Sequence, residues 1–173
     1  MGGASRVCGA IPRPVKLGRH APPLKAPRAS RLAPIAMPNV TVTRLLRFNA
    51  AHRVHNPALS DDENRALFGK CNNPNWHGHN YTLEVSVRGP IDERTGYVMD
   101  LGALKRIVEE RVVDQVDHRN MNVDVPFMQG VIPTTENIVV QMWRIVAPAV
   151  APATLVRLRL WETENNYVEY EGD

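Results

Sequence analysis

Residues 77–87, "HGHNYTLEVSV", place every second side chain in one phase, and this alternation constrains the fold more than any other feature of the chain. His77 and His79 share their phase with the aromatic Tyr81 and the aliphatic Leu83, Val85 and Val87. Side chains two residues apart point the same way on a β-strand, whereas on an α-helix they diverge by roughly 200°. The segment is therefore predicted to be a half-buried strand with its two histidines on the apolar face.

A second alternating segment covers residues 40–54, "VTVTRLLRFNAAHRV". His52 is in phase with the apolar Leu46, Phe48 and Ala50, while charged and polar residues take the other phase. The pattern predicts a second strand that carries a third histidine on its apolar face. Three imidazoles from two strands are thus expected to converge.

A third strand is predicted in residues 153–164, "ATLVRLRLWETE". Glu162 follows the phase of Val156, Leu158 and Leu160. A carboxylate in a buried phase is costly unless it is paired or hydrogen-bonded, so Glu162 is a candidate functional residue. The alternative is a β-bulge that shifts the register and returns Glu162 to solvent.

Two helices are predicted between the second and third strands. Asp100 is the expected N-cap of the first, and Thr134 or Thr135 that of the second. Their apolar stripes are formed by Leu101, Leu104, Ile107, Val108 and Val112, and by Ile138, Met142 and Ile145. With a short last strand in "NYVEYEG", the order predicts an α+β domain, in which a four-stranded antiparallel sheet carries two helices on one face.

The composition changes near residue 37. Residues 1–37 hold seven of the 21 Lys/Arg, none of the 18 Asp/Glu, six prolines and four glycines. The remaining 14 basic and 18 acidic residues belong to 38–173, so the net charge of +3 comes from the tail and does not indicate nucleic-acid binding. No apolar run is long enough for a membrane span. We expect one domain, 38–173, after a disordered basic tail, 1–37.

The tail admits a second interpretation. It bears arginines and no acid, as an organelle transit peptide does, although its prolines and scarce serines argue against one. The chain's two cysteines, Cys8 and Cys71, fall on opposite sides of the boundary, so a disulfide is not expected and a reducing compartment is the default. The expected localisation is cytoplasmic, with a mitochondrion or another organelle as the alternative.

Three histidines without paired cysteines nearby are typical of a catalytic zinc site, which takes three protein ligands and leaves one position open. We predict that His52, His77 and His79 bind Zn²⁺. His55 competes with His52 for this role, but it lies beside Asn56 in a turn-like stretch before a proline.

Cys71 lies in the turn-forming segment "GKCNNPN" and is open to two interpretations. As a fourth ligand it would close the metal site and make it structural. As a loop thiol beside Lys70 and near a metal, it would serve as a base or nucleophile. The spacing alone does not decide between them.

Two further motifs give weaker signals. Asp117-His118 is an adjacent pair in a predicted loop, where such pairs also occur by chance. The stretch Thr134, Thr135 and Glu136 is mainly a helix cap, although free backbone N–H groups at a helix start also bind polar ligands.

From about Thr43 to Gly172 the chain resembles the 6-pyruvoyl-tetrahydropterin synthase family. The matching segments are "FNAAHR", "LFGKCNNPNWHGHNY", "GYVMDLGALK", "DHRNMNVDVPF", "PTTENI" and "WETENNYVEY". The Cys-to-His-Gly-His segment and the "ETENN" strand end are the most specific in combination. Two positions depart from the family: Trp76 stands where glycine is frequent, and Asn122 stands where aspartate is common.

The resemblance implies a tunnelling fold, in which three subunits close their sheets into a barrel and two trimers stack into a homo-hexamer with sites where subunits meet. It implies zinc on the three histidines and proton transfer by Cys71, assisted by Asp117 and His118. Glu162 would bind the pterin ring, helped by Thr134, Thr135 and Glu136. The implied reaction, in tetrahydrobiopterin biosynthesis, converts 7,8-dihydroneopterin triphosphate to 6-pyruvoyl-tetrahydropterin with elimination of triphosphate. Lys70 and Arg53 are candidates for contacting the triphosphate.

Two other functions are kept open. A sister activity would be 6-carboxytetrahydropterin synthesis or side-chain cleavage by an aldolase. The carboxy-forming relatives have a shorter loop than the one between Cys71 and His77, and the aldolases replace the cysteine by glutamate. A non-enzymatic zinc-stabilised module would need Cys71 as a closing ligand or a pocket blocked by Trp76.

Overall fold

The computed structural model describes residues 37–172 of the chain. The expectations for the basic tail, including the transit peptide, and for Cys8 therefore lie outside the described residues.

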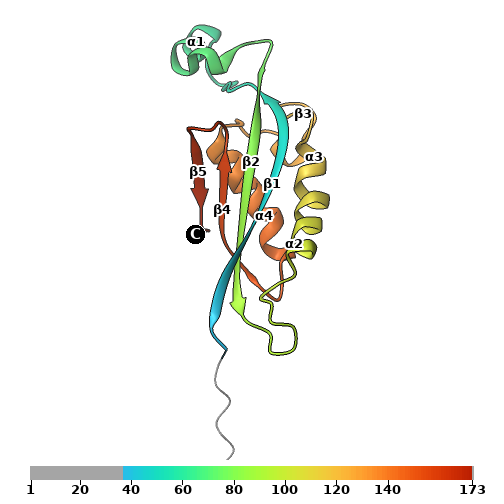
Figure 1. The fold of residues 1–173 in the computed structure, drawn as a ribbon. Helices are drawn as coiled ribbons and strands as arrows, with labels where there is room; N and C mark the ends of the chain where they lie inside the picture. Colours follow the sequence, from blue (N-terminus) through green and yellow to red (C-terminus); the bar gives the residue numbers. More distant parts are fainter. Residues whose placement is uncertain (1–36, 173) are drawn as a thin grey trace, which may run out of the picture. The chain divides into compact units, whose positions relative to one another are not determined.

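Two long strands, β1 (Asn39–His52) and β2 (His77–Pro90), form the centre of the sheet (Figure 1). They pair antiparallel in one unbroken register, from Asn39 opposite Pro90 to His52 opposite His77. The buried residues of these strands include the apolar phase expected from the sequence, Leu46, Phe48, Ala50, His52, Tyr81, Leu83, Val85 and Val87, except that His77 and His79 are partly exposed. The two predicted strands and their phases are thereby confirmed.

The sheet has five strands in the order β3-β1-β2-β4-β5, with β4 at Thr154–Trp161 and β5 at Tyr167–Tyr170. The prediction of four antiparallel strands is wrong in one respect, because β3 (Arg119–Asn120) runs parallel to β1 and makes the sheet mixed. Two residues are too few to show an alternating pattern. Backbone hydrogen bonds from His118 to Asn49 and from Met121 to Ala51 hold β3 in place.

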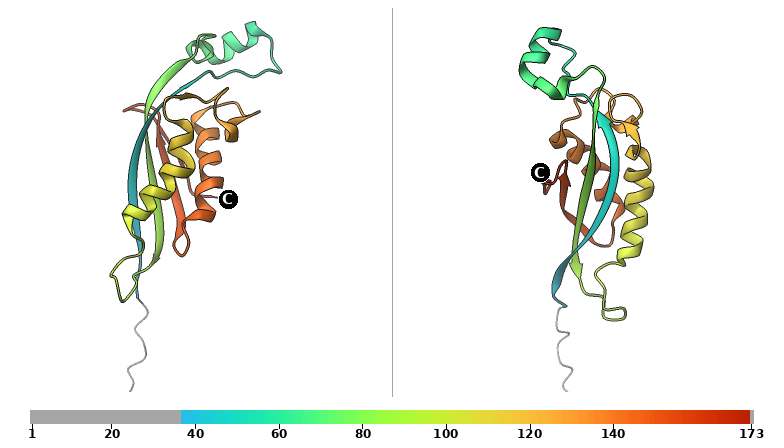
Figure 2. Two further views of the ribbon diagram at one scale, coloured as in Figure 1. Left: turned by 90° about the vertical axis from the view of Figure 1, so that its right-hand side faces the viewer. Right: turned by 45° about the horizontal axis from the view of Figure 1, so that its top comes forward.

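Helices cover one face of this sheet (Figures 1 and 2). The first is α2 (Leu101–Val108), which continues through a π-helical turn (Glu109–Val113) into α3 (Asp114–Val116), and the second is α4 (Thr135–Val146). The predicted N-caps are confirmed: Asp100 accepts from the backbone of Gly102 at 2.6 Å, and Thr134 accepts from that of Asn137 at 3.3 Å. No helix among residues 37–172 is long and apolar enough to cross a membrane.

The segment between β1 and β2 contains a helix that was not predicted, α1 (Asp61–Phe68), followed by a 3₁₀ turn (Gly69–Asn72). A signal was present, since Ser60 and Glu63 form a capping box in which each side chain accepts from the other's backbone N–H. The helix lies beyond the His52 and His77 ends of the central strands (Figure 2). Two further 3₁₀ turns occupy Pro126–Met128 and Ala147–Ala149.

Strand β4 contains a bulge opposite residues Ser86 and Val87. Arg157 pairs with Ser86 whereas Leu155 pairs with Val87, so Leu155 is buried in place of the predicted Val156. The extra residue falls at the start of the strand, and its later half keeps the predicted phase.

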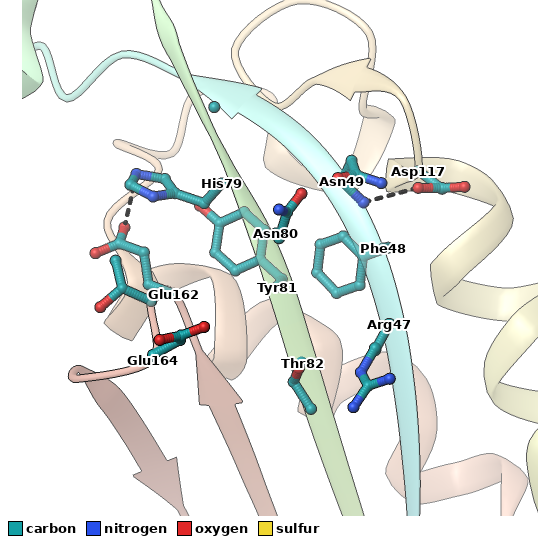
Figure 3. A pocket seen from close by; sticks show the side chains of 12 residues that line it. Arg47, Phe48, Asn49, His79, Asn80, Tyr81, Thr82, Asp117, Glu162 and Glu164 are labelled. Carbon is teal, nitrogen blue, oxygen red and sulfur yellow. Dashed lines mark hydrogen bonds and ion pairs between the residues drawn. The ribbon is translucent and has the colours of Figure 1, made fainter.

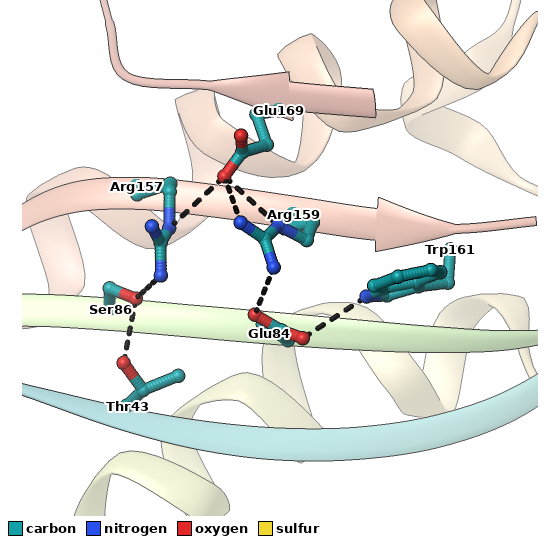
Figure 4. A network of polar contacts seen from close by, with 7 residues as sticks. All are labelled: Thr43, Glu84, Ser86, Arg157, Arg159, Trp161 and Glu169. Carbon is teal, nitrogen blue, oxygen red and sulfur yellow. Dashed lines mark hydrogen bonds and ion pairs between the residues drawn. The ribbon is translucent and has the colours of Figure 1, made fainter. Parts of the chain in front are cut away.

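The open face of the sheet, without helices, carries a polar network (Figure 4). Glu84 accepts from the indole N–H of Trp161 at 3.0 Å and lies 3.6 Å from the guanidinium of Arg159. Arg159 in turn donates to Glu169 at 2.7 Å. Side chains of three neighbouring strands thus bind one another across the face that the helices leave uncovered.

Candidate active site

Strand register brings the three histidines together. His52 is directly opposite His77, and His79 is opposite Ala50, the residue two before His52. One ligand atom of each imidazole lies within 4.8 Å of the other two, and the ring centroids are 4.4 to 5.1 Å apart. The expected convergence of three imidazoles is therefore observed.

Gly78 allows this close approach of the strands. A Cβ at this position would lie 3.2 Å from the carbonyl oxygen of Ala50, closer than nine in ten such contacts. A larger residue between His77 and His79 would push the strands apart at the point where the histidines meet.

Hydrogen bonding and burial leave donor atoms free for a metal. Nδ1 of His52 is bonded to the carbonyl oxygen of Pro133 at 2.8 Å, which fixes the ring and leaves Nε2 available. Nε2 of His52 and Nδ1 of His77 are buried, and neither has a hydrogen-bond partner among the described residues. Buried unpaired nitrogens are costly, and a bound cation would satisfy them. Three imidazole nitrogens are a donor set that suits zinc.

The same burial keeps the imidazoles in the form that binds metal. Loss of solvent lowers the pKa of His52 and of His77 below 6.5, and repulsion between neighbouring histidines lowers them further. The neutral imidazole is the ligand form, so the cluster is prepared for a cation near neutral pH.

Glu162 follows the last residue of β4 and points toward His79 (Figure 3). One carboxylate oxygen, Oε1, is 3.6 Å from Nε2 of His52 and 3.7 Å from Nε2 of His79, and it accepts from the hydroxyl of Thr135 at 2.9 Å. Its side chain is 24% exposed. The bulge proposed as an alternative lies at the far end of β4, so Glu162 keeps the predicted phase.

A cavity of about 340 Å³ joins most of the predicted site residues. Its lining includes His52, Cys71, Thr134, Thr135, Glu136 and Glu162. These residues come from β1, from the segment before β2, from the start of α4 and from the end of β4. Each of these four segments contributes a side chain able to bind or transfer a proton, while Val54 and Val168 add apolar surface to the lining.

Cys71 lines this cavity as an exposed free thiol and not as part of the histidine group. Among residues 37–172 the group of side chains whose donor atoms meet consists of the three histidines alone. His55 does not join it either, because its Nδ1 lies 3.1 Å from the amide nitrogen of Asn72. Within the described residues, Cys71 is therefore not a fourth member of the histidine group.

Asp117 and His118 form a pair away from that cavity. The carboxylate of Asp117 accepts from the backbone N–H of Asn49 at 2.7 Å, and its other oxygen lies 3.0 Å from Nδ1 of His118. The Asn49 bond lowers the pKa of Asp117 below its ordinary value, and the His118 contacts lower it further. His118 is 78% exposed and has the unusual backbone φ of 58°.

Asp117 lines a second cavity, of about 740 Å³, together with His79 and Glu162, and His118 lines a third, of about 480 Å³, which also includes His79. Figure 3 shows Asp117 beside Asn49 on β1, across β2 from Glu162. Within one chain, Asp117 and His118 are not brought into the cavity that Cys71 lines.

Two backbone groups complete the site and were not predicted. The carbonyl of Pro133 orients His52, and the N–H of Asn49 holds Asp117. Backbone groups are the same for every residue type, so the sequence carried no signal for either.

Fold and site together define a class: an α+β domain with a three-histidine group of the kind that holds a catalytic metal. The family described as 6-pyruvoyl tetrahydropterin synthase matches residues 41–173. The chain belongs to this family, as the sequence motifs predicted.

Individual relatives agree with this assignment. The human 6-pyruvoyl tetrahydrobiopterin synthase is 46% identical over 132 residues, which cover 76% of this chain and 91% of the human protein. The enzyme of that name from Drosophila melanogaster is 43% identical over 136 residues, covering 78% of this chain and 81% of its own. The structure of Caenorhabditis elegans 6-pyruvoyl tetrahydropterin synthase superposes with a TM-score of 0.76 at 42% identity, covering 80% of this chain and 99% of the other.

Proposed function

We propose that this chain is a zinc-dependent lyase that converts 7,8-dihydroneopterin triphosphate to 6-pyruvoyl-tetrahydropterin and releases triphosphate. The observation that carries the proposal is the shared cavity, in which a thiol and a carboxylate lie with His52, a member of the three-histidine group. Family membership supports the same reaction.

The site residues have distinct tasks in this reaction. Zinc bound by His52, His77 and His79 would act as a Lewis acid that polarises the side-chain oxygens of the substrate and acidifies the adjacent C–H. Cys71 takes a proton from the substrate side chain and returns one to it, so that the hydroxyls become ketones without an external redox cofactor.

Glu162 orients the ring while this occurs. Its carboxylate accepts hydrogen bonds from the pterin N–H groups, and charge-assisted bonds of this kind are the strong ones. Thr135 already donates to the same carboxylate and holds it in place. The first turn of α4, with Thr134 and Glu136 on the cavity wall, offers further polar contacts to the ring.

Asp117 and His118 serve the same chemistry from a neighbouring copy. Asp117 orients the imidazole of His118, as a carboxylate does in other acid–base pairs. Since one chain does not bring this pair to Cys71, the complete site forms between subunits. The edge of β1 supports such an assembly, because β3 pairs with it only at Ala50 and Ala51 and leaves the rest without a strand partner among residues 37–172. Three sheets closed into a barrel, and two such trimers stacked as a hexamer, would cover that edge.

The test is incubation of the zinc-loaded full chain with 7,8-dihydroneopterin triphosphate. The expected products are 6-pyruvoyl-tetrahydropterin, identified by mass, and free triphosphate in equal amount. A carboxylated or side-chain-cleaved pterin would establish a sister activity instead, and no product would refute the proposal. A fluorescent fusion of the full chain, beside one of residues 38–173, would test the expected cytoplasmic localisation against import into an organelle.

A further inference from the structure

Cys71 has a demanding position for a group that transfers protons. It lies in the segment between β1 and β2, outside the sheet, and it is exposed. A reacting group that is misplaced by an ångström can lose roughly a hundredfold in rate. Something other than the sheet must therefore hold the Cys71 segment against the histidine group.

Asn72, the next residue, is 2% exposed although its neighbours in the turn are polar and open. Its amide nitrogen donates to the carbonyl of Val54 at 2.8 Å. The backbone N–H of Val54 donates to the carbonyl of Cys71 at 2.9 Å. Cys71 and Asn72 thus bind both backbone polar groups of Val54, the residue two positions after His52.

The side chain of Arg53 also binds Asn72. Its guanidinium donates through Nε to the backbone oxygen of Asn72 at 3.0 Å and through Nη2 to the side-chain oxygen at 3.1 Å. This fork needs the planar geometry of arginine. These two nitrogens are engaged within the chain, and the contact of Arg53 with triphosphate stays a prediction.

Asn122, which stands where aspartate is common in the family, has a physical reason to be an asparagine: it forms two hydrogen bonds with the backbone of Arg53. Its side-chain oxygen accepts from the backbone N–H of Arg53 at 2.8 Å, and its amide nitrogen donates to the carbonyl of Arg53 at 2.9 Å. An ionised aspartate accepts only, so it could not make the second bond. The residue that follows His52 is therefore fixed through its backbone as well as its side chain.

We infer that Asn72 is a positioning residue for the Cys71 thiol, with Arg53 as its support. The inference rests on the proposed function, because it assigns to Cys71 the proton transfer of that reaction. It goes further because it names what sets the distance between the thiol and the metal. Hydrogen bonds join Arg53, the residue after His52, to Asn72, the residue after Cys71.

Asn72→Asp is the sharpest variant. It keeps the volume and the acceptor that Arg53 binds, but replaces the donor to Val54 by a second acceptor. Asn75→Asp is the matched control, since Asn75 is exposed, lies in the same segment and undergoes the same chemical change. Arg53→Lys keeps the positive charge but loses the paired hydrogen bonds to Asn72. Its kcat should therefore lie between those of Asn72→Asp and Asn75→Asp.

Four quantities are measured on the full chain: zinc per subunit, the thermal midpoint, kcat with KM, and the rate at which iodoacetamide alkylates Cys71, followed by peptide mass. For Asn72→Asp we expect kcat to fall roughly ten- to a hundredfold, with KM and zinc unchanged and an altered alkylation rate. Asn75→Asp should match the wild type in all four.

Two results would overturn the inference. One is that Asn72→Asp has the same kcat and the same Cys71 alkylation rate as the wild type. The other is a loss of zinc and thermal stability in step with turnover, which would make Asn72 a general structural residue. If the wild type itself shows no turnover, the proposed function fails, and the alkylation rate together with zinc content still decides whether Asn72 holds Cys71.

Discussion

The proposed metal-binding part and the proposed proton-transfer part of the candidate site are built in different ways. The three histidines lie on two fully paired strands, and their donor atoms meet within a single chain. Cys71 lies in a connecting segment, and Asp117 and His118 lie in a loop beside two other cavities.

The difference follows from what positions each group. Register over two strands of 14 residues fixes every side chain at once, because a slip of one residue would move the whole apolar set to the wrong face. A connecting segment has no such register and depends on a few hydrogen bonds. We therefore expect metal binding to be a property of one chain, and proton transfer to require local clamps and a second copy.

The largest expected effect separates the two parts by mutation. His77→Ala removes a ligand and should cost more zinc affinity than the roughly 10–100-fold typical of a lost supporting contact, and turnover should go with it. Cys71→Ser should keep full zinc and lose roughly 10²–10⁴-fold in kcat. Zinc per subunit by mass spectrometry and product formation provide the two readouts. Zinc loss in Cys71→Ser would show a closed structural site and contradict the separation.

The next effect tests whether the proton-transfer part spans two copies. Cys71→Ser and His118→Ala should each be nearly inactive as pure proteins. If a site takes its thiol and its imidazole from different chains, unfolding and refolding an equal mixture should restore about a quarter of the wild-type sites. Mixing without subunit exchange is the control. No gain after exchange would place the whole site in one chain, against the proposed assembly.

What the sequence could and could not predict divides along the same line. The phases of His52, His77 and His79 follow from alternation, and Glu162 was placed by the same pattern. The caps at Asp100 and Thr134 are local and were also predictable. Each of these predictions depends only on nearby residues or on the strand period.

The missed features depend on contacts between distant segments. The strand β3 has two residues and no pattern of its own, and it is set by hydrogen bonds to β1. The bonds from Arg53 to Asn72 and to Asn122 join residues 19 and 69 positions apart. Helix α1 is the exception, since its capping box at Ser60 and Glu63 was readable in the sequence.

A smaller effect concerns pH and the zinc-free protein. Burial lowers the pKa of His52 and His77 in the folded chain, whereas the unfolded chain keeps values near 6.5. Below that pH the unfolded state binds protons on these histidines that the folded state does not bind. The free energy of unfolding should therefore fall as the pH falls from about 6.5 towards the lower pKa values of the folded chain. Urea unfolding of zinc-free protein at about pH 7.5 and about pH 5.5 measures this. The double variant His52→Gln and His77→Gln should flatten the dependence, and an unchanged slope would contradict the assigned cause.

The smallest effect lies at the junction of the two parts, at Trp76. Its backbone has a φ of 60°, in the left-handed region that costs a residue with a Cβ about 1–2 kcal/mol and that glycine adopts without this cost. Trp76→Gly should raise the free energy of unfolding by up to about 1 kcal/mol, because the relief of strain exceeds the extra freedom that glycine gives the unfolded chain.

Tyr97→Gly is the control for that change, since Tyr97 is also an exposed aromatic residue but is not among the described residues with positive φ. It should lower stability, by roughly the 0.5–1 kcal/mol that glycine costs at an ordinary position. Chemical unfolding of the two variants measures the difference. If Trp76→Gly is destabilised as much as Tyr97→Gly, the indole makes contacts that outweigh its strained backbone. A partner subunit would then be the first place to look for them, because 42% of Trp76 is exposed in the single chain.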